Sequence, residues 1–226
     1  MAATVALYRT SIGKKTVMAV TGIILYLFMI LHIYGNLKVF EGREKFNAYS
    51  DYLRTVGNPI FFRTELLWTI RVVLLVSVIL HIVAAVQLTQ RSVASRPVRY
   101  VNKKETDATF ASRTMRWGGL VIFFFIIYHI LDLTLGTAHS GTYQQGDVYG
   151  NVVSGFSHWY VTAFYLLAML ALGFHLYHGV WSMFQTLGIN RRKYNRFFRG
   201  LALVSAVLIG GGGCVVPLAI LTGIVS

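Results

Sequence analysis

Histidines lie inside four long apolar stretches of this 226-residue chain, where an ionisable side chain is costly to keep and so indicates a function. The first in each stretch are His32, His81, His129 and His175, and these four come from four successive apolar segments. A neutral imidazole binds a metal through one ring nitrogen, or it hydrogen-bonds a neighbouring helix. A single intramembrane histidine more often serves the second purpose, so a metal site has to be argued from the arrangement of all four.

The order of the segments predicts the depth of each histidine. Successive spans cross a membrane in opposite directions, and His32 and His129 lie late in the first and third spans, in the outer half if the N-terminus is cytoplasmic. His81 and His175 lie towards the inner ends of the second and fourth spans, so we expect them in the inner half. Two layers of two imidazoles suit two porphyrins stacked across a membrane, each iron bound by a histidine on either face.

The other histidines and the cysteine refine this hypothesis. His178 follows His175 by three residues on almost the same helical face, so spacing alone leaves both as possible ligands. His139 and His158 fall in or beside a polar connection, where we expect solvated side chains. The single cysteine, Cys214, excludes a CxxCH attachment, so any haem must be held by coordination and packing alone.

Five apolar segments position these histidines. The chain is 55% hydrophobic and 13% charged, and each segment is long enough to cross a bilayer as a helix. The sequence therefore predicts an all-α polytopic membrane bundle that forms one domain over residues 1–226. The predicted transmembrane helices cover residues 16–39, 66–88, 117–135, 159–187 and 200–224.

Two stretches outside the histidine segments also predict structure. The first connection contains Phe46, Tyr49 and Tyr52, so part of it is expected to form an interfacial helix. The last segment has no histidine, and its glycines at 210–213 together with Pro217 predict a loosened helix that packs closely beside a neighbour.

Basic residues predict the orientation of the five helices. Lys and Arg gather before the first segment, between the second and third, and between the fourth and fifth, whereas the third connection and the C-terminal tail carry none. This pattern favours a cytoplasmic N-terminus. The first connection disagrees, because it holds basic residues among acidic ones. The net charge of +13 is thus assigned to membrane topology, and no nucleic acid partner is expected.

Several motifs resemble those of a known family. They are SIGKKTVMAVTG and HIYGNL near the start, the segments around His81 and His129, and HLYHGVWSMFQTLG near the end. In this order they resemble the cytochrome b membrane-anchor subunit of succinate dehydrogenase and fumarate reductase complexes. More narrowly, the chain is similar to the five-helix, single-chain anchor with two haems b that many menaquinone-using bacteria possess.

The resemblance implies ligands and partners. His32 and His129 would bind the distal haem, towards the outside, and His81 and His175 the proximal haem, towards the cytoplasm. The family's fourth ligand is the first histidine of HLYHG, which favours His175 over His178. The implied partners are a flavoprotein with covalent FAD and an iron-sulfur subunit, which would pass electrons through the two haems to menaquinone or another quinone.

Charged residues near the membrane edges are candidates for proton exchange with the quinone and for binding haem propionates. Glu65 and Asp132 are candidates for proton exchange with the quinone, because anchors of this family use an acidic residue in this general region. Arg71, Lys15 and Arg116 are candidates for binding haem propionates. Arg71 has two alternatives: it extends to the outer interface, or it pairs with Glu65 or Asp132.

The sequence offers no succinate chemistry of its own. It has no dinucleotide-binding fingerprint and no set of cysteines for an iron-sulfur cluster. The predicted activity is therefore quinone reduction by a subunit of succinate:quinone oxidoreductase. Two alternatives remain open: a cytochrome b of a hydrogenase or formate dehydrogenase complex, and a haem-free membrane scaffold or proton relay.

Overall fold

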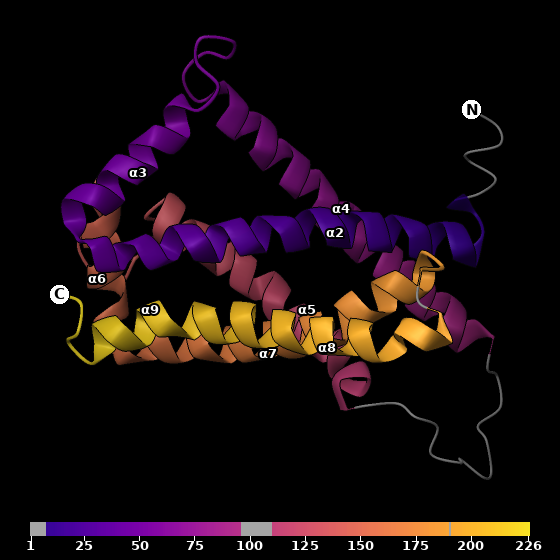
Figure 1. Cartoon of the computed structure of the whole chain (residues 1–226). Coiled ribbons are helices and arrows are strands. Elements are labelled where there is room, and N and C mark those ends of the chain that lie inside the picture. The colour runs from indigo at the N-terminus through magenta and orange to yellow at the C-terminus, as the bar shows by residue number, and fades with distance from the viewer. Residues whose placement is uncertain (1–7, 96–109, 190) are drawn as a thin grey trace.

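The computed structural model describes residues 8–95, 110–189 and 191–226. Within these residues the chain is helical and has no strand (Figure 1). Five helices are long and apolar enough to cross a membrane, which confirms the predicted all-α class and the five spans. The spans are Ser11–Glu41, Glu65–Ala94, Thr114–Thr134, Trp159–Thr186 and Arg192–Leu221.

The helical elements follow one another along the chain with short breaks. In order they are α2 (Ser11–Leu37), η1 (Lys38–Glu41), α3 (Arg43–Thr55), α4 (Glu65–Ala94), α5 (Phe110–His129), η2 (Ile130–Thr134), α6 (Val148–Phe156), α7 (Trp159–Thr186), η3 (Arg192–Tyr194), α8 (Asn195–Ser205), η4 (Ala206–Gly211) and α9 (Gly212–Leu221). The segments η2 and η4 are π-helical. The last span is therefore one nearly continuous rod from α8 to α9 that begins before the predicted residue 200.

Two helix pairs and one central helix organise the bundle. Helix α2 packs mainly on α4, and α5 packs mainly on α7. Helix α7 also contacts α2 and runs along the rod of α8, η4 and α9. Figure 1 shows that α3 and the first half of α4 diverge from α2 and meet at the connection between them. Much of the apolar surface of α4 is consequently exposed, as expected for a helix whose solvent is lipid.

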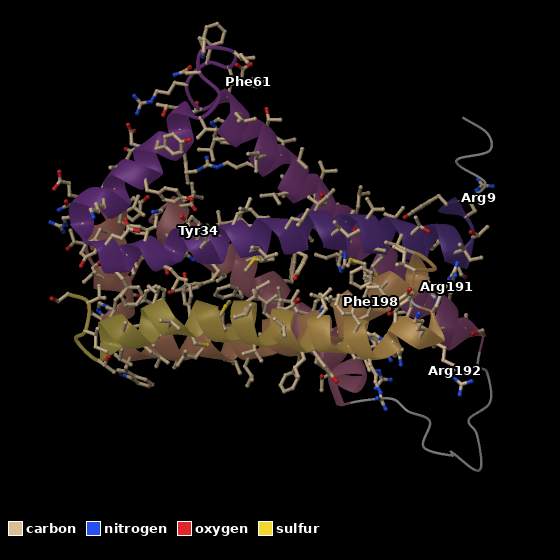
Figure 2. The ribbon with its side chains drawn as sticks, viewed as in Figure 1. Arg9, Tyr34, Phe61, Arg191, Arg192 and Phe198 are labelled. Atoms are coloured by element: carbon tan, nitrogen blue, oxygen red, sulfur yellow. The ribbon has the colours of Figure 1, made fainter. Side chains whose placement is uncertain are left out.

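Arginines from the first and the last basic regions lie at one end of the bundle. Figure 2 shows Arg9, Arg191 and Arg192 at the same end, and Figure 1 shows the C-terminus at the opposite end. This arrangement agrees with the predicted sharing of one side by the first and last basic regions. The basic connection at residues 96–109 lies outside the described residues. The membrane side that each end faces stays a prediction.

The glycines of the last span allow two helix backbones to approach closely, as the sequence predicted. A Cβ atom built on Gly210 would lie 3.1 Å from both the Gly173 Cα and the Met169 carbonyl oxygen of α7. These are backbone atoms, which cannot move aside as a flexible side chain can. A Cβ on the adjacent Gly211 would meet nothing within 4 Å.

Helix α3 is held by polar contacts to the N-terminus of α6. The Asn47 amide donates to Asp147 Oδ1 at 2.9 Å, and the Tyr149 N–H donates to Asn47 Oδ1 at 2.9 Å. Arg43 pairs with Asp147 at 3.0 Å, and Asp147 also accepts from the Gly150 N–H at the start of α6. The helical structure of α3 is confirmed, whereas its interfacial position stays a prediction. The sequence did not predict α6.

We expect Gly210→Ala to destabilise the protein by about 1–3 kcal/mol, because the added methyl group overpacks the contact between the rod and α7. Gly211→Ala is the matched control, since it brings the same gain in helix propensity without a clash. Thermal unfolding of the detergent-solubilised protein measures the difference. Equal unfolding temperatures for the two variants would show that this backbone contact does not limit stability.

Asp147 gives a pH prediction for the contact between α3 and α6. Its pKa lies below the ordinary value of 3.8, mainly because the Asn47 amide hydrogen-bonds to the carboxylate. The ionised Asp147 carboxylate therefore stabilises the folded protein fully above pH 3.8, and this stabilisation is lost as the pH falls through the lowered pKa. We expect Asp147→Asn to speed pepsin cleavage between α3 and α4 well above pH 3.8, and wild type to match this variant well below it. A difference that persists at low pH would contradict this role.

Candidate functional site

The structure brings together His32 at the end of α2 and His129 at the end of α5. Their ring centroids are 5.7 Å apart and the ring planes are nearly perpendicular, at 87°. Phe28 stacks on His32 at 5.1 Å, and Phe125 lies 5.6 Å from the His129 ring. The two imidazoles therefore meet inside an aromatic, apolar environment.

A second pair forms between His81 on α4 and His175 on α7. Their ring centroids are 6.2 Å apart, with an interplanar angle of 53°. The His178 ring instead packs on Trp181, at 6.3 Å. His175, and not His178, is therefore the residue of the HLYHG motif that faces a histidine of another helix. The four residues pair as the depth argument predicted, while their role as ligands stays a prediction.

The two pairs lie at different levels along α2. His81 contacts the Met18 carbonyl oxygen and the Thr21 hydroxyl, whereas His129 lies beside His32. From Thr21 to His32 a helix rises by roughly 16 Å. Each pair is thus a separate site with one histidine from the α2–α4 pair and one from the α5–α7 pair.

The distances within the pairs fit an iron atom between two imidazoles. A metal–nitrogen bond of about 2 Å and roughly 1.2 Å from nitrogen to ring centre, on each side, separate the two centroids by about 6.4 Å. The observed separations of 5.7 and 6.2 Å are close to this value. In the part of the chain that the structure describes, no group of three or more His, Cys, Asp or Glu residues could hold a bare ion. Two donors per site suit haem, whose macrocycle supplies four more.

The hydrogen bonds of the imidazoles also fit ligation. His81 Nδ1 lies 3.1 Å from the Met18 carbonyl oxygen, and His129 Nδ1 lies 3.2 Å from the Tyr165 hydroxyl, so Nε2 of each ring is left to bind a metal. His175 Nδ1 is buried and has no hydrogen-bond partner among the described residues. A buried polar atom of this kind normally has a partner, so it marks the second site for a bound group.

Glycines lie beside both rings of the second site. A Cβ atom on Gly22 of α2 would lie 3.5 Å from His81 Cε1, and one on Gly119 of α5 would lie 3.9 Å from His175 Cε1. Neither glycine covers its imidazole with a side chain. Two glycines therefore lie against the rings of the second site.

A buried hydrogen-bond network leads outward from His129. The Tyr165 hydroxyl, which contacts His129, donates to Asp132 Oδ2 at 3.0 Å. Asp132 Oδ1 lies 2.7 Å from His139 Nδ1, and His139 Nε2 lies 2.9 Å from the Ser154 hydroxyl of α6. We call these five residues the Asp132 network. Asp132 is only 1% exposed, so the network connects the first site to the segment between η2 and α6 through the interior.

The solvated side chain expected for His139 was wrong. Its side chain is 1% exposed, because the connection after η2 folds back and α6 covers it. His158 is half-buried and hydrogen-bonds the Ser154 carbonyl oxygen at 3.0 Å, so it is not fully solvated either. Tyr165 was not predicted as a site residue. Its signal was a tyrosine in an otherwise apolar stretch near the outer end of the fourth span.

The family comparison fits this arrangement of paired histidines on membrane helices. A family model described as succinate dehydrogenase/fumarate reductase transmembrane subunit matches residues 89–212, more than half of the chain. The chain belongs to this family. The match includes His129, Asp132 and His175, whereas His32 and His81 precede it. Searches of curated proteins and of solved structures gave no match.

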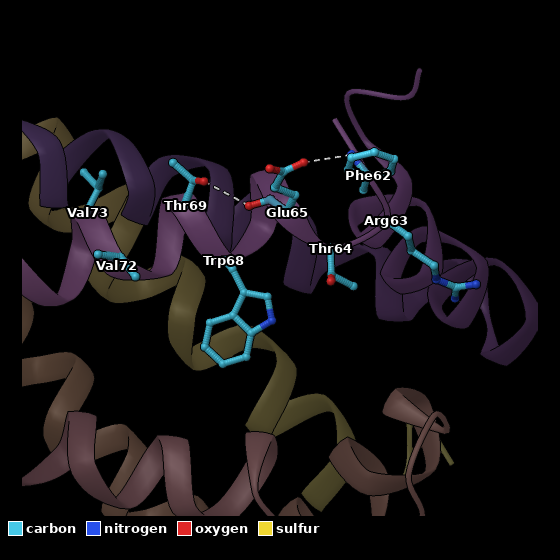
Figure 3. Close-up of a pocket in the computed structure, with 8 residues that line it drawn as sticks. All are labelled: Phe62, Arg63, Thr64, Glu65, Trp68, Thr69, Val72 and Val73. Atoms are coloured by element: carbon cyan, nitrogen blue, oxygen red, sulfur yellow. Dashed lines mark hydrogen bonds between the residues drawn. The ribbon is translucent and has the colours of Figure 1, made fainter. Parts of the chain in front are cut away.

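The remaining candidates of this transmembrane subunit lie at its edges. Glu65 begins α4, and its Oε2 accepts a hydrogen bond from the Phe62 N–H at 2.9 Å (Figure 3). It lines an open hollow with apolar neighbours that include Trp68 and Val72. The Arg71 guanidinium lies 5.0 Å from the Trp68 ring centre, and the described residues show no ion pair between Arg71 and Glu65 or Asp132.

The basic candidates at the other end of the transmembrane subunit are exposed. Lys15 and Arg116 are both exposed. Lys14 is instead buried, where it hydrogen-bonds Gln87 and lies 4.3 Å from the Tyr8 ring centre. Sequence position alone did not separate these two adjacent lysines.

Proposed function

We propose that this transmembrane subunit is a di-haem cytochrome b of succinate:quinone oxidoreductase in a bacterial cell membrane. It would carry electrons from a cytoplasmic iron-sulfur subunit to menaquinone or another quinone. The single observation that supports this function is the presence of two separate, buried pairs of imidazoles, His32 with His129 and His81 with His175. Family membership supports the succinate-linked complex over a hydrogenase or formate dehydrogenase.

The residues of this chain would hold and shield the two groups. His32 and His129 would hold the distal haem, and His81 and His175 the proximal haem. Each would bind through an imidazole nitrogen that does not hydrogen-bond another helix among the described residues. Each haem would supply one-electron transfer at an iron with two axial histidines. Aromatic rings around the first site exclude water from the imidazoles, and the Met18 carbonyl fixes the orientation of His81.

Proton exchange with the quinone would use an acidic residue near the outer end. Glu65 lies in an open hollow with apolar neighbours, where a quinone would bind, whereas Asp132 is buried. We therefore favour Glu65 as the group that meets the quinone. Asp132 remains the alternative, because its network leads from the first site to the segment between η2 and α6.

The partner subunits would bind at the basic end of the bundle. Arg9, Arg191 and Arg192 gather there (Figure 2), and Arg91 lies at the same end because its guanidinium donates to the Arg9 carbonyl oxygen. Positive charge at a membrane face attracts an acidic protein surface. An iron-sulfur subunit and a flavoprotein subunit are the partners that the family implies.

The first test is a haem count in the purified, detergent-solubilised complex. A reduced-minus-oxidised spectrum with a pyridine haemochrome assay should give about two protohaems per chain. His32→Ala should remove one of them and leave the other, because each site has its own pair of ligands. Absence of haem from the fully assembled complex would refute the proposal, and loss of both haems on this single change would refute the separate sites.

The second test separates two histidines of α7. We expect His175→Ala to lose one haem, because His175 faces His81. His178→Ala should keep both haems, since the His178 ring packs on Trp181. The same spectrum and haem count measure both variants. Loss of haem from His178→Ala alone would assign the ligand to His178 and overturn the pairing.

A further inference from the structure

The two histidine pairs differ in the groups that hydrogen-bond their imidazoles. The Asp132 network ends on His129 of the first pair, whereas His81 of the second pair bonds a neutral backbone carbonyl. Only the first pair is thus connected to a buried carboxylate within the described residues. The proposed ligands do not explain this difference, because they are two histidines at both sites.

We propose that Asp132, acting through Tyr165, is a positioning residue for His129 and lowers the reduction potential of the distal haem. This inference rests on the proposed di-haem function. It assigns to Asp132 a role that does not require contact with quinone.

The directions of the hydrogen bonds support this role. With Nε2 of His129 on iron, Nδ1 carries the proton and donates to the Tyr165 oxygen at 3.2 Å. The Tyr165 hydroxyl must then direct its own proton elsewhere, and it donates to Asp132 Oδ2 at 3.0 Å. Every donor in this path therefore points from the ligand towards the carboxylate.

The carboxylate is held from its other side as well. His139 Nδ1 donates to Asp132 Oδ1 at 2.7 Å, and Ser154 of α6 lies 2.9 Å from His139 Nε2. A Cβ atom on Gly155 would lie only 3.1 Å from His139 Cε1, so α6 fits closely against this ring. Both oxygens of Asp132 are thus fixed between two helices and the segment between η2 and α6.

The Tyr165 ring has little freedom to turn away. Phe125 and Phe156 contact it edge to face at centroid distances of 4.9 and 4.7 Å, both at 89°. Tyr165 itself is 4% exposed. The hydroxyl therefore stays between His129 and Asp132, as a relay of hydrogen bonding requires.

The electronic consequence follows from the charge of the carboxylate. An ionised acceptor strengthens the hydrogen bond from Tyr165 and polarises its oxygen, which then accepts more strongly from His129. An imidazole that donates to a stronger acceptor is a more basic ligand and favours the oxidised iron. The network should therefore lower the potential of the distal haem and leave the proximal haem unaffected.

The test is a potentiometric redox titration of the purified, assembled complex, followed optically at both haems. We expect Tyr165→Phe to keep both haems and to shift one midpoint potential upward while the other stays unchanged. Asp132→Asn should shift the same haem in the same direction, because it removes the charge and keeps the shape. The low-spin ferric EPR signal of that haem should change in both variants.

The matched control is Tyr26→Phe. Tyr26 also loses an interhelical contact in this change, with the Ser205 hydroxyl at 2.7 Å, yet it hydrogen-bonds no histidine. Both potentials should stay at their wild-type values in this variant. A shift equal to that of Tyr165→Phe would show that any lost tyrosine contact disturbs the haems and would overturn the proposal.

The outcomes separate this inference from the function on which it rests. Wild-type complex without haem refutes the di-haem function itself. Two haems with unchanged potentials in Tyr165→Phe, or equal shifts of both, refute the positioning role alone. If Tyr165→Phe loses a haem, Asp132→Asn decides, because it keeps the Tyr165 ring: an upward shift of one potential supports the proposal and unchanged potentials overturn it.

Discussion

The arrangement of this protein depends on the cost of keeping imidazoles in an apolar interior. A ring nitrogen surrounded by hydrocarbon needs a hydrogen bond or a metal, and water is not at hand to supply either. The fold brings histidines of different helices together in two places, His32 with His129 and His81 with His175. Glycines lie beside the second pair, and aromatic rings lie beside the first.

The sequence predicted the features that depend on one helix at a time. Apolar length fixed the five spans, and the direction of each span placed the four histidines in two layers. The close approach at Gly210 also followed from local sequence, because only small residues permit it. Features that need the folded connections were missed. His139 looked solvated because its neighbours are polar, and only the return of α6 across it explains its burial.

The candidates at the membrane edges show a second reason for failure. Lys14 and Lys15 are adjacent and chemically alike, yet the rotation of α2 buries one against Gln87 and exposes the other. Asp132 likewise became interpretable only with Tyr165, which is 33 residues away along the chain. A pairing between distant helices leaves no periodic signal in either of them. The site therefore required the structure, whereas the spans did not.

The packing of the helices suggests how such a molecule comes together. Helix α2 packs mainly on α4 and α5 packs mainly on α7, so the first four spans form two antiparallel hairpins. Each histidine pair takes one residue from each hairpin. Under the proposed function, the haems would cross-link the two hairpins. The cofactor would then act as an assembly checkpoint, and cells short of haem would accumulate a subunit whose hairpins are made but not joined.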